Sequence, residues 1–200
     1  MSTDPNSATI AAYEAHVADY VATTPHELGP SLKHWIDQAL SRISAGSTIL
    51  EVGSGLGRDA DYMESRGHLV VRSDAARGFV AYMRGQGHSA RVLNILTQDL
   101  GGPYAMVFAD AVILHFNAEQ AALSFERAHR ALRPGGIFAL SLKRGDGDAW
   151  SKDKLGAPRY FYYWQAAPLR AALKVAGFRS VTISTVAVGA QGWLMVVASA

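Results

Sequence analysis

One stretch decides the fold of this chain: Ile49-Leu50-Glu51-Val52-Gly53-Ser54-Gly55-Leu56-Gly57-Arg58-Asp59. The apolar run from Thr48 to Val52 predicts a buried strand, and the residues from Arg58 onward predict the first turn of a helix. The three glycines between them let a ligand approach the main chain without meeting a Cβ atom. The free N–H groups at the helix N-terminus then point towards that ligand. The stretch therefore predicts a ligand-binding turn.

Two kinds of ligand compete for this turn. The segment from Gly55 to Ala60 fits G-x-G-x-x-A, and Asp74 follows 74 − 55 = 19 residues later, near the spacing of the ribose-binding acid in dinucleotide sites. In the other interpretation the motif includes Glu51, two residues before the first glycine, and the ligand is not a dinucleotide. An acid beside the turn suits a positively charged ligand and repels a pyrophosphate, which favours the second interpretation. A glycine-rich turn without a ligand is the third possibility.

Composition narrows the class of protein. Two hundred residues are enough for one domain with its own core, and a net charge of +2 gives no reason to expect broad binding to nucleic acid phosphates. The absence of cysteine excludes disulfides, thiolate metal sites and a cysteine nucleophile. No apolar run is long enough to span a bilayer, and the polar segment from Met1 to Ser7 lacks the core of a signal peptide. We therefore expect a cytoplasmic protein without a membrane partner.

Strand and helix patterns alternate along the chain. Helices are expected over residues 8–21, with Ser7 as the N-cap, and over 31–43, 58–66, 76–84, 118–132 and 165–176. Strands are expected over residues 48–52, 68–74, 90–94, 104–109, 137–142, 181–188 and 193–199, with a mobile loop over 143–156. The alternation predicts a parallel sheet with helices on both faces. The short glycine-bearing link between the last two strands predicts an antiparallel hairpin, which a purely parallel dinucleotide fold does not need.

Over nearly its whole length the chain resembles the class I methyltransferases that use S-adenosylmethionine (SAM). The segments that carry the resemblance follow one another in the family's order: residues 49–59, 66–74, 107–116, 132–136 and 176–178. Two positions depart from the family, since Asn94 stands where an acid is common and Tyr104-Ala105 where Phe-Asp is usual. The resemblance implies an α/β fold. Its three-layer, Rossmann-like sheet has seven strands in the order 3-2-1-4-5-7-6, with the last strand antiparallel and helices on both faces.

The resemblance also implies how the chain is organised. Residues 1–200 are expected to form a single SAM-methyltransferase domain. Residues 1–45 are the N-terminal helices that cover the substrate side, and residues 46–142 are the cofactor-binding core. Residues 143–164 are the substrate loop, and residues 165–200 are the C-terminal helix and β-hairpin.

The resemblance assigns residues to the cofactor. The cofactor-binding set is Glu51, Gly53, Ser54, Gly55, Gly57, Arg58, Asp74, Ala75, Asn94, Ile95 and Leu96. Asp74 is expected to accept hydrogen bonds from the two ribose hydroxyls, although an acid two residues before Ala76 could simply cap a helix. Arg58 could pair with the methionine carboxylate of SAM or lie exposed on the first helical turn. Asn94 and the two apolar residues after it are expected to flank adenine, and the apolar pair could equally be core.

Catalytic and substrate residues are expected near the exit of the fourth strand. His115 lies there and could be a general base, a substrate contact or a packed, hydrogen-bonded histidine. The expected substrate set is Tyr13, Tyr20, His115, Lys143, Tyr160 and Tyr163. Trp35 could help Tyr13 and Tyr20 to close the pocket. The other six histidines have no metal-ligand spacing, so no metal is expected.

The predicted activity is SN2 transfer of the SAM methyl group to an O, N, S or C nucleophile, which leaves S-adenosyl-L-homocysteine. A small molecule is the favoured acceptor, because the chain has neither a basic patch nor room for an appended RNA-binding domain. A protein or RNA acceptor stays open. Two alternatives from other classes are a NAD(P)-dependent oxidoreductase and a SAM-binding module without catalysis. The sequence does not decide whether the chain self-associates.

Overall fold

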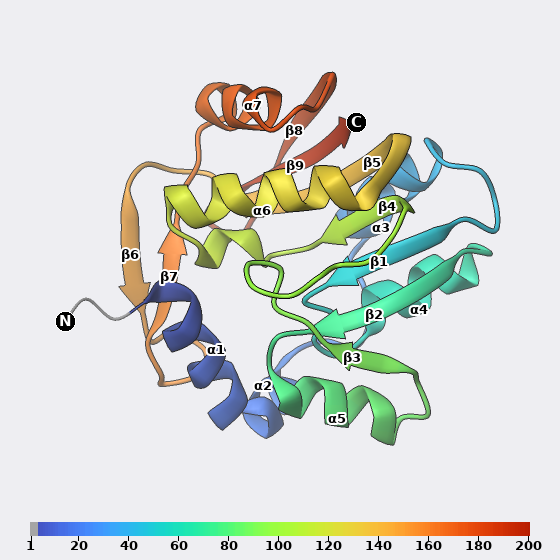
Figure 1. The fold of residues 1–200 in the computed structure, drawn as a ribbon. Coiled ribbons are helices and arrows are strands. Elements are labelled where there is room, and N and C mark those ends of the chain that lie inside the picture. Colours follow the sequence, from blue (N-terminus) through green and yellow to red (C-terminus); the bar gives the residue numbers. More distant parts are fainter. Residues whose placement is uncertain (1–3) are drawn as a thin grey trace.

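Seven strands form the main sheet, in the order β3-β2-β1-β4-β5-β9-β8 (Figure 1). The computed structural model describes residues 4–200. The strands of this sheet are β1 (Thr48–Val52), β2 (Leu69–Asp74), β3 (Ala90–Val92), β4 (Tyr104–Ala109), β5 (Leu132–Lys143), β8 (Ser180–Val188) and β9 (Gln191–Ser199). β1 to β5 pair in parallel, and β9 runs antiparallel to β5 and β8. The predicted order is confirmed, because β8 and β9 are the sixth and seventh strands of this sheet along the chain.

Helices cover both faces of the sheet. They are α1 (Pro5–Ala15), α2 (Val17–Thr23), α3 (Pro30–Leu40), α4 (Arg58–Ser65), α5 (Arg77–Gly85), the 3₁₀ helix η1 (Ile113–His115), α6 (Ala118–Ala131) and α7 (Ala166–Val175). On one face α3 and α4 pack Trp35 and Met63 against Met106. On the other face α6 and α7 pack Phe125 and Leu169, and Figure 1 shows α6 in front of the sheet. Because both faces are covered, every residue of β4 is buried.

A reciprocal cap fixes the start of α6. The side chain of Asn117 accepts a hydrogen bond from the Gln120 amide at 2.9 Å, and the Gln120 side chain accepts one from the Asn117 amide at 3.2 Å. Two main-chain donors that the helix leaves unpaired are thus satisfied. The cap fixes the point at which the chain turns from η1, which carries His115, into α6.

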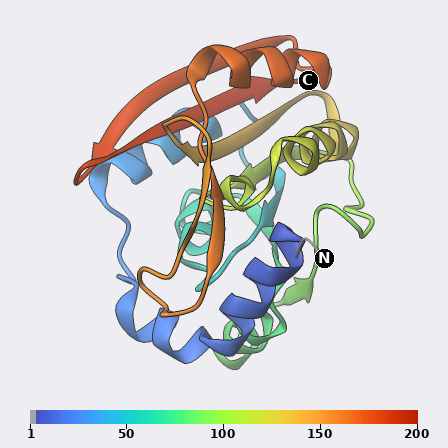
Figure 2. The same ribbon diagram turned by 90° about the vertical axis from the view of Figure 1, so that its left-hand side faces the viewer.

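One end of the sheet is covered by segments from distant parts of the chain. β6 (Asp148–Ser151) and β7 (Arg159–Tyr162) form a separate antiparallel hairpin. β1, β2 and β4 point towards the side of the molecule that holds α1, α2 and this hairpin (Figure 1), and Figure 2 looks onto that side. The hydroxyl of Thr9 on α1 accepts a hydrogen bond from the Tyr160 amide on β7 at 3.1 Å. The N-terminal helices and the hairpin therefore lie over the carboxyl ends of the parallel strands.

The N-terminus differs from the sequence-based prediction. The single helix expected over residues 8–21 is two helices, because the chain leaves helical geometry at His16, where φ is −129°. Asp4 rather than Ser7 caps α1: its Oδ2 accepts a hydrogen bond from the Ser7 amide at 2.8 Å, and Pro5 takes the first helical position. Residues 1–3 of the predicted polar N-terminus lie outside the described residues.

Two other local predictions were wrong. The loop expected over residues 143–156 contains β6, which pairs with β7 from Asp148↔Tyr162 to Ser151↔Arg159. The strand expected over residues 137–142 begins at Leu132 instead, so residues 134–136 lie inside an irregular strand. The pairing of β4 with β5 shifts its register between Tyr104 and Met106 to accommodate them. Within residues 4–200, no helix combines the length and the apolar character needed to cross a membrane.

Candidate active site

A cavity of about 430 Å³ lies at the carboxyl ends of the parallel strands. From β3 to β5 its wall contains, in the order of the strands, Asn94, Asp74, Gly53, Asp110 and Lys143. Side chains of α1, α2 and β7 supply the opposite wall. Small-molecule sites commonly have volumes of about 300–1,000 Å³. The position also agrees with the rule that open α/β sheets bind ligands outside the carboxyl ends of their strands.

The glycine turn opens the main chain to this cavity. Gly53, Gly55 and Gly57 have φ of +72°, +53° and +83°, which side chains rarely adopt. A Cβ atom at Gly53 would lie 2.4 Å from Cγ2 of Val112, so the fold itself requires glycine there. A Cβ atom at Gly55 would meet no protein atom within 4 Å, and Gly55 lines the cavity. Gly57 does not line the cavity and serves as the N-cap of α4.

Asp74 joins the end of β2 to the glycine turn. Its Oδ2 accepts a hydrogen bond from the Gly55 amide and its Oδ1 one from the Ala76 amide, both at 2.9 Å. Ala76 is itself the N-cap of α5, so Asp74 stabilises the turn before the helix without capping it. Burial raises the pKa of Asp74 to about 6, against the effect of these hydrogen bonds. Each carboxylate oxygen keeps a lone pair for a ligand hydroxyl.

Three carboxyl groups, of which Glu51 and Asp59 are buried and Asp110 is partly buried, lie close to the turn. Asp59 and Asp110 line the cavity, and Glu51 lies behind its wall with 2% of its surface exposed. Burial raises the pKa of Glu51 to about 7 and raises the pKa values of Asp59 and Asp110. Among the described residues, Glu51 Oε2 and Asp59 Oδ1 have no hydrogen-bond donor. Buried acceptors without a hydrogen-bond donor, one of them 3.4 Å from Arg58 Nε, fit a ligand that brings a positively charged donor, such as an ammonium group.

The wall near β3 is partly polar. The Asn94 side chain donates a hydrogen bond to Asn6 Oδ1 at 2.7 Å and accepts one from the Leu96 amide at 3.0 Å. Asn94 and Ile95 line the cavity, as does Ala75 after β2. Leu96 does not line it and packs against the core. The structure thus places two of the three residues predicted for adenine at the cavity surface.

Arg58 lies at the cavity on the first turn of α4. Its Nη1 donates a hydrogen bond to the carbonyl oxygen of Pro25 at 2.9 Å, and its Nε lies 3.4 Å from Asp59 Oδ1. Ser54, also at the cavity, accepts a hydrogen bond from the Ser73 amide at 3.0 Å and thereby ties the turn to β2. Both predicted cofactor residues are held by main-chain contacts.

His115 is held between two partners. Its Nδ1 lies 2.6 Å from the carbonyl oxygen of Tyr160, and its Nε2 lies 3.0 Å from the hydroxyl of Tyr13. Because a carbonyl oxygen only accepts, Nδ1 carries the proton and Nε2 accepts from Tyr13. Burial, followed by the positive charges of Arg159 and Lys143, lowers the pKa of His115 to about 3. The histidine is therefore neutral and its basic nitrogen is occupied, which supports the packed, hydrogen-bonded alternative.

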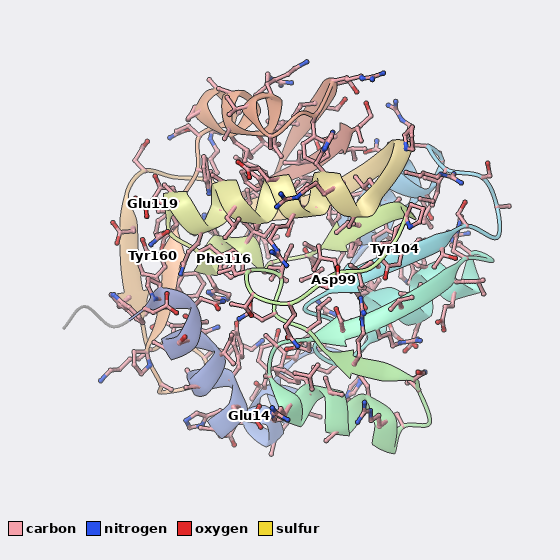
Figure 3. All side chains as sticks on the ribbon, in the orientation of Figure 1. Glu14, Asp99, Tyr104, Phe116, Glu119 and Tyr160 are labelled. Carbon is pink, nitrogen blue, oxygen red and sulfur yellow. The ribbon has the colours of Figure 1, made fainter. Side chains whose placement is uncertain are left out.

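The predicted substrate residues separate into two groups. Tyr13, Tyr20, His115 and Lys143 line the cavity, whereas Tyr160 and Tyr163 do not. Tyr160, labelled in Figure 3 on β7, packs its ring edge-on against Trp150, with the ring centroids 5.4 Å apart. Its main chain contributes instead, through the contacts to His115 and α1 described above.

Two further aromatic predictions need correction. The ring of Tyr163 lies against Gly145, where an added Cβ atom would approach the ring to 3.2 Å. Trp35, expected to help close the pocket, is buried with the core of α3 and donates a hydrogen bond to the Val196 carbonyl at 3.3 Å. The alternation of side chains along β7 explains the outcome for the aromatic run, because Arg159 and Phe161 face the cavity while Tyr160 points away.

Several cavity residues were missed by the sequence interpretation. The most informative are Asn6, Asp59, Asp110, Arg159 and Phe161. Asp59 and Asp110 follow the first and fourth strands and could have been found from that position. Asn6 and Arg159 carry no local signal, because only the packing of α1 and β7 over the sheet brings them to the site.

A group of acids lies outside the cavity. Asp61, Glu64 and His88 offer ligand atoms within 4.8 Å of one another and are the one such group in the part of the chain that the structure describes. Asp61 and Glu64 pair with the buried Arg72 at 2.6 and 2.7 Å. Both acids already pair with the guanidinium group, so we assign them a structural role.

Residues 50–140 match the family model described as a methyltransferase domain. This segment runs from β1 into β5 and contains the glycine turn, Asp74 and His115. No curated protein matches the sequence.

Solved structures resemble the whole chain. One is the 1,6-didemethyltoxoflavin-N1-methyltransferase of Burkholderia thailandensis, bound to 1,6-didemethyltoxoflavin and S-adenosylhomocysteine. It has 16% identity and a TM-score of 0.77, with 100% of this chain and 91% of that chain covered. The magnesium protoporphyrin IX methyltransferase of Synechocystis PCC 6803, with bound S-adenosylhomocysteine, has 16% identity and a TM-score of 0.75, with 98% and 99% covered. The CcbJ methyltransferase of Streptomyces caelestis has 17% identity and a TM-score of 0.70, with 94% and 98% covered.

The fold and the site define a class of protein. A seven-stranded sheet with an antiparallel last strand, a glycine turn after β1 and an acid at the end of β2 make a Rossmann-like protein that binds an adenosine-containing cofactor. The family model shows a methyltransferase domain over residues 50–140, and the fold around it is that of the class I SAM-dependent methyltransferases. The resemblance found in the sequence is thereby confirmed, and the NAD(P)-dependent alternative is not favoured.

Proposed function

We propose that the enzyme methylates a small molecule held in the same cavity as the cofactor. One observation carries this proposal: a single cavity joins the glycine turn to a second compartment formed by α1, α2, β5 and β7. The hairpin and the N-terminal helices lie over the carboxyl ends of the parallel strands (Figure 2), and their side chains cover that compartment. A roofed site of this kind favours a compact acceptor over a macromolecule.

We assign the methionine part of the cofactor to the turn after β1. Gly53, Ser54 and Gly55 would contact it through the open main chain. The ammonium group would lie near Asp59 and Asp110, with Glu51 acting from behind the wall. The two buried acceptor oxygens without donors support this assignment. In this scheme Arg58 would face the carboxylate of the cofactor, and the residues present therefore fit SAM.

We assign the adenosine part to the ends of β2 and β3. Asp74, with a free lone pair on each oxygen, would accept hydrogen bonds from the ribose hydroxyls. Ala75, Asn94 and Ile95 line the adjoining wall and would flank adenine. The order of strands β3-β2-β1 matches the order of adenine, ribose and methionine in the cofactor.

The reaction requires alignment more than acid–base chemistry. Bound SAM supplies a methyl group on a sulfonium, already activated for SN2 transfer to a nucleophile. The protein holds the acceptor in line and excludes water, and this can contribute several kcal/mol, up to about 7–11 for ideal geometry. Tyr13 and Tyr20 on the N-terminal helices and Phe161 on β7 form the aromatic part of the acceptor compartment. His115 orients Tyr13 through their hydrogen bond.

We also propose that residues 1–200 act as one methyltransferase domain. In this scheme α1 to α3 and residues 143–164 belong to the acceptor side, and residues 46–142 hold the cofactor. α1 accepts hydrogen bonds from both β7 and Asn94. These contacts support a shared role for the acceptor side and the cofactor side.

Calorimetry with S-adenosylhomocysteine and with NADH tests the cofactor assignment. We expect micromolar binding of the former and none of the latter. Binding of NADH alone would overturn the assignment. The acceptor is then sought by incubating the enzyme and SAM with pools of small molecules, bulk protein and bulk RNA. S-adenosylhomocysteine release with a small-molecule pool supports the proposal, while release only with protein or RNA contradicts it. Binding of the cofactor without release in any pool favours the non-catalytic SAM-binding module.

A further inference from the structure

Three positively charged side chains line the cavity on its β5 and β7 side. They are Lys143 at the end of β5, Arg159 on β7 and Lys154 between the hairpin strands. None of them forms an ion pair with an acid among residues 4–200. Asp153 also lines the cavity, but it accepts from Arg159 through its main-chain carbonyl oxygen. Three cations face one carboxyl group, Asp153, on this side of the cavity, so this compartment carries a net positive charge.

Arg159 is the most buried of the three, with 6% of its surface exposed. Its Nη1 donates to the Tyr13 hydroxyl at 3.1 Å and its Nη2 to the Asp153 carbonyl oxygen. Both acceptors are neutral, and Nε has no partner among the described residues. A guanidinium group has five N–H donors, so most of its hydrogen-bonding capacity is unused. Burying a charge without a counter-ion costs several kcal/mol, which an anionic ligand would offset.

The two lysines are less buried than Arg159, and their contacts are also with neutral groups. The Lys143 ammonium lies 3.9 Å from the centre of the Phe161 ring, and burial and the charge of Arg159 lower its pKa. The Lys154 ammonium donates to the Thr24 hydroxyl at 2.8 Å and lies 3.7 Å from the centre of the Tyr20 ring. An aromatic face and a hydroxyl group stabilise an ammonium group only modestly. Both lysines can therefore add to the attraction for an anion.

Lys143 and Arg159 lie at a distance from the glycine turn and Asp74, which form the cofactor side of the cavity. The sheet order β3-β2-β1-β4-β5 puts Lys143 two strands beyond the glycine turn and three beyond Asp74. Neighbouring strands are about 4.8 Å apart, so Lys143 lies roughly 10 Å along the sheet from the turn. Arg159 lies on the same side, because its guanidinium group stands 5.2 Å from the centre of the Phe161 ring, as Lys143 does at 3.9 Å. Lys154 lies over the Tyr20 ring of α2.

We propose that the methyl acceptor carries an oxyanion, a carboxylate or a phosphate, which binds Arg159 and Lys143. This inference rests on the proposed function, because it assumes that the β5 and β7 compartment is the acceptor site. The aromatic faces of Phe161 and Tyr13 beside the two cations favour an acceptor whose anion is attached to a planar or apolar body. The unused donors of Arg159 suit the two oxygens of such a group.

Calorimetry on protein saturated with S-adenosylhomocysteine tests the proposal. The probes are benzoate and phenyl phosphate, with benzamide as the neutral counterpart of benzoate. We expect one or both anions to bind and benzamide to bind at least about tenfold more weakly, the effect of one charge-assisted hydrogen bond. The stronger of the two anions identifies the kind of oxyanion. Binding of benzamide as tight as that of benzoate, or binding of no probe, would overturn the proposal.

Variants locate the anion. Arg159→Met and Lys143→Met should each weaken the bound anion by about tenfold or more, whereas Lys152→Met, an exposed lysine on the same hairpin, should not change it. Arg159→Lys keeps the charge and should restore part of the affinity, which separates lost charge from lost folding. Affinity for S-adenosylhomocysteine should be the same in all four variants. If it falls with the loss of Arg159 or Lys143, these cations hold the cofactor carboxylate, and the acceptor proposal fails while the cofactor assignment stands.

Discussion

The hydroxyl of Tyr13 lies 3.0 Å from Nε2 of His115 and joins the first helix of the chain to the exit of the fourth strand. Since Nδ1 of His115 donates to the Tyr160 carbonyl oxygen, the hydroxyl proton must point to Nε2. Arg159 completes this series of hydrogen bonds by donating to the hydroxyl oxygen of Tyr13 at 3.1 Å. The histidine that the sequence offered as a base thus acts in this structure as the link between α1, η1 and β7.

Replacing His115 should alter stability in a pH-dependent way. Its folded-state pKa of about 3 lies below the ordinary 6.5, so between these values the unfolded chain binds a proton that the folded chain does not. The contribution of His115 is therefore present above pH 6.5 and is lost as the pH falls. His115→Asn, which keeps a donor for Tyr160, should cost about 1–3 kcal/mol at pH 7.5. The cost should be about 1–2 kcal/mol smaller at pH 5.

Urea denaturation at the two pH values measures this difference. If His115→Asn lowers the free energy of unfolding equally at pH 5 and pH 7.5, His115 titrates normally in the folded protein. His26→Asn, at an exposed histidine, serves as the control and should change stability little at either pH. Once an acceptor is known, His115→Ala should lower turnover and leave SAM affinity nearly intact, and an unchanged rate would remove His115 from the mechanism.

Asp74→Ala should weaken the binding of SAM and of S-adenosylhomocysteine by about 2–4 kcal/mol, because two hydrogen bonds to a charged group are lost. Asp74→Asn should have a smaller effect, since it keeps one oxygen acceptor. Glu126→Ala, at an exposed acid on α6, is the control. Calorimetry gives the affinities, and thermal melting checks that the glycine turn survives the loss of its bond to Asp74. Unaltered affinity in a folded Asp74→Ala variant would refute the ribose assignment.

Glu51 should couple cofactor binding to proton release. Burial raises its pKa to about 7, so part of the population carries a proton at neutral pH. A cationic cofactor favours the ionised form, and binding near pH 7 should therefore release protons. The heat of binding should vary with the ionisation enthalpy of the buffer, and Glu51→Gln should reduce that variation and weaken binding at pH 8. Equal proton release in the variant and the parent would assign the effect to Asp59 or Asp110.

The same residue should limit stability in alkaline solution. Its folded pKa of about 7 lies above the ordinary 4.5, so the folded chain keeps a proton that the unfolded chain has lost. The favourable contribution is complete below pH 4.5 and disappears as the pH rises through 7. Without ligand, Glu51→Gln should exceed the parent in stability by about 1–3 kcal/mol at pH 8 and by less at pH 5. Urea denaturation at pH 5 and pH 8 measures the stability of Glu51→Gln relative to the parent, with Glu126→Gln as the control.

Two glycines of the turn should respond differently to alanine. Gly53→Ala combines a φ of +72° with a Cβ atom 2.4 Å from Val112, so it should cost more than the about 1–2 kcal/mol of the strain alone. Gly55→Ala should cost only that strain but should abolish most cofactor binding, because its Cβ atom would enter the cavity. Gly46→Ala, with a φ of +73° and open space, is the matched control for strain remote from the site. Full cofactor affinity in Gly55→Ala would place the ligand elsewhere.

Much of the fold could be predicted from local sequence. The apolar run before Gly53 and the glycines after it determine a strand–turn–helix unit, because positive φ and a close main-chain approach need glycine. The link from Gly189 to Gly192 identified the antiparallel hairpin of β8 and β9. The cap of α1 was missed because Asp4 and Ser7 both suit an N-cap, and the proline after Asp4 decides between them.

The sequence by itself predicted the fold class, the sheet order and the glycine turn, because each of these depends on short motifs whose residues are close together in the chain. Only the tertiary structure decided the acceptor side. It brings Tyr13, His115 and Arg159 together from segments up to 146 residues apart and turns Tyr160 away from the cavity. The physical reason is that burial, the charges that surround a group and the free lone pairs of a side chain depend on neighbours that no local pattern encodes. These neighbours make His115 a neutral hydrogen-bond acceptor and leave Arg159 as a buried cation without a counter-ion.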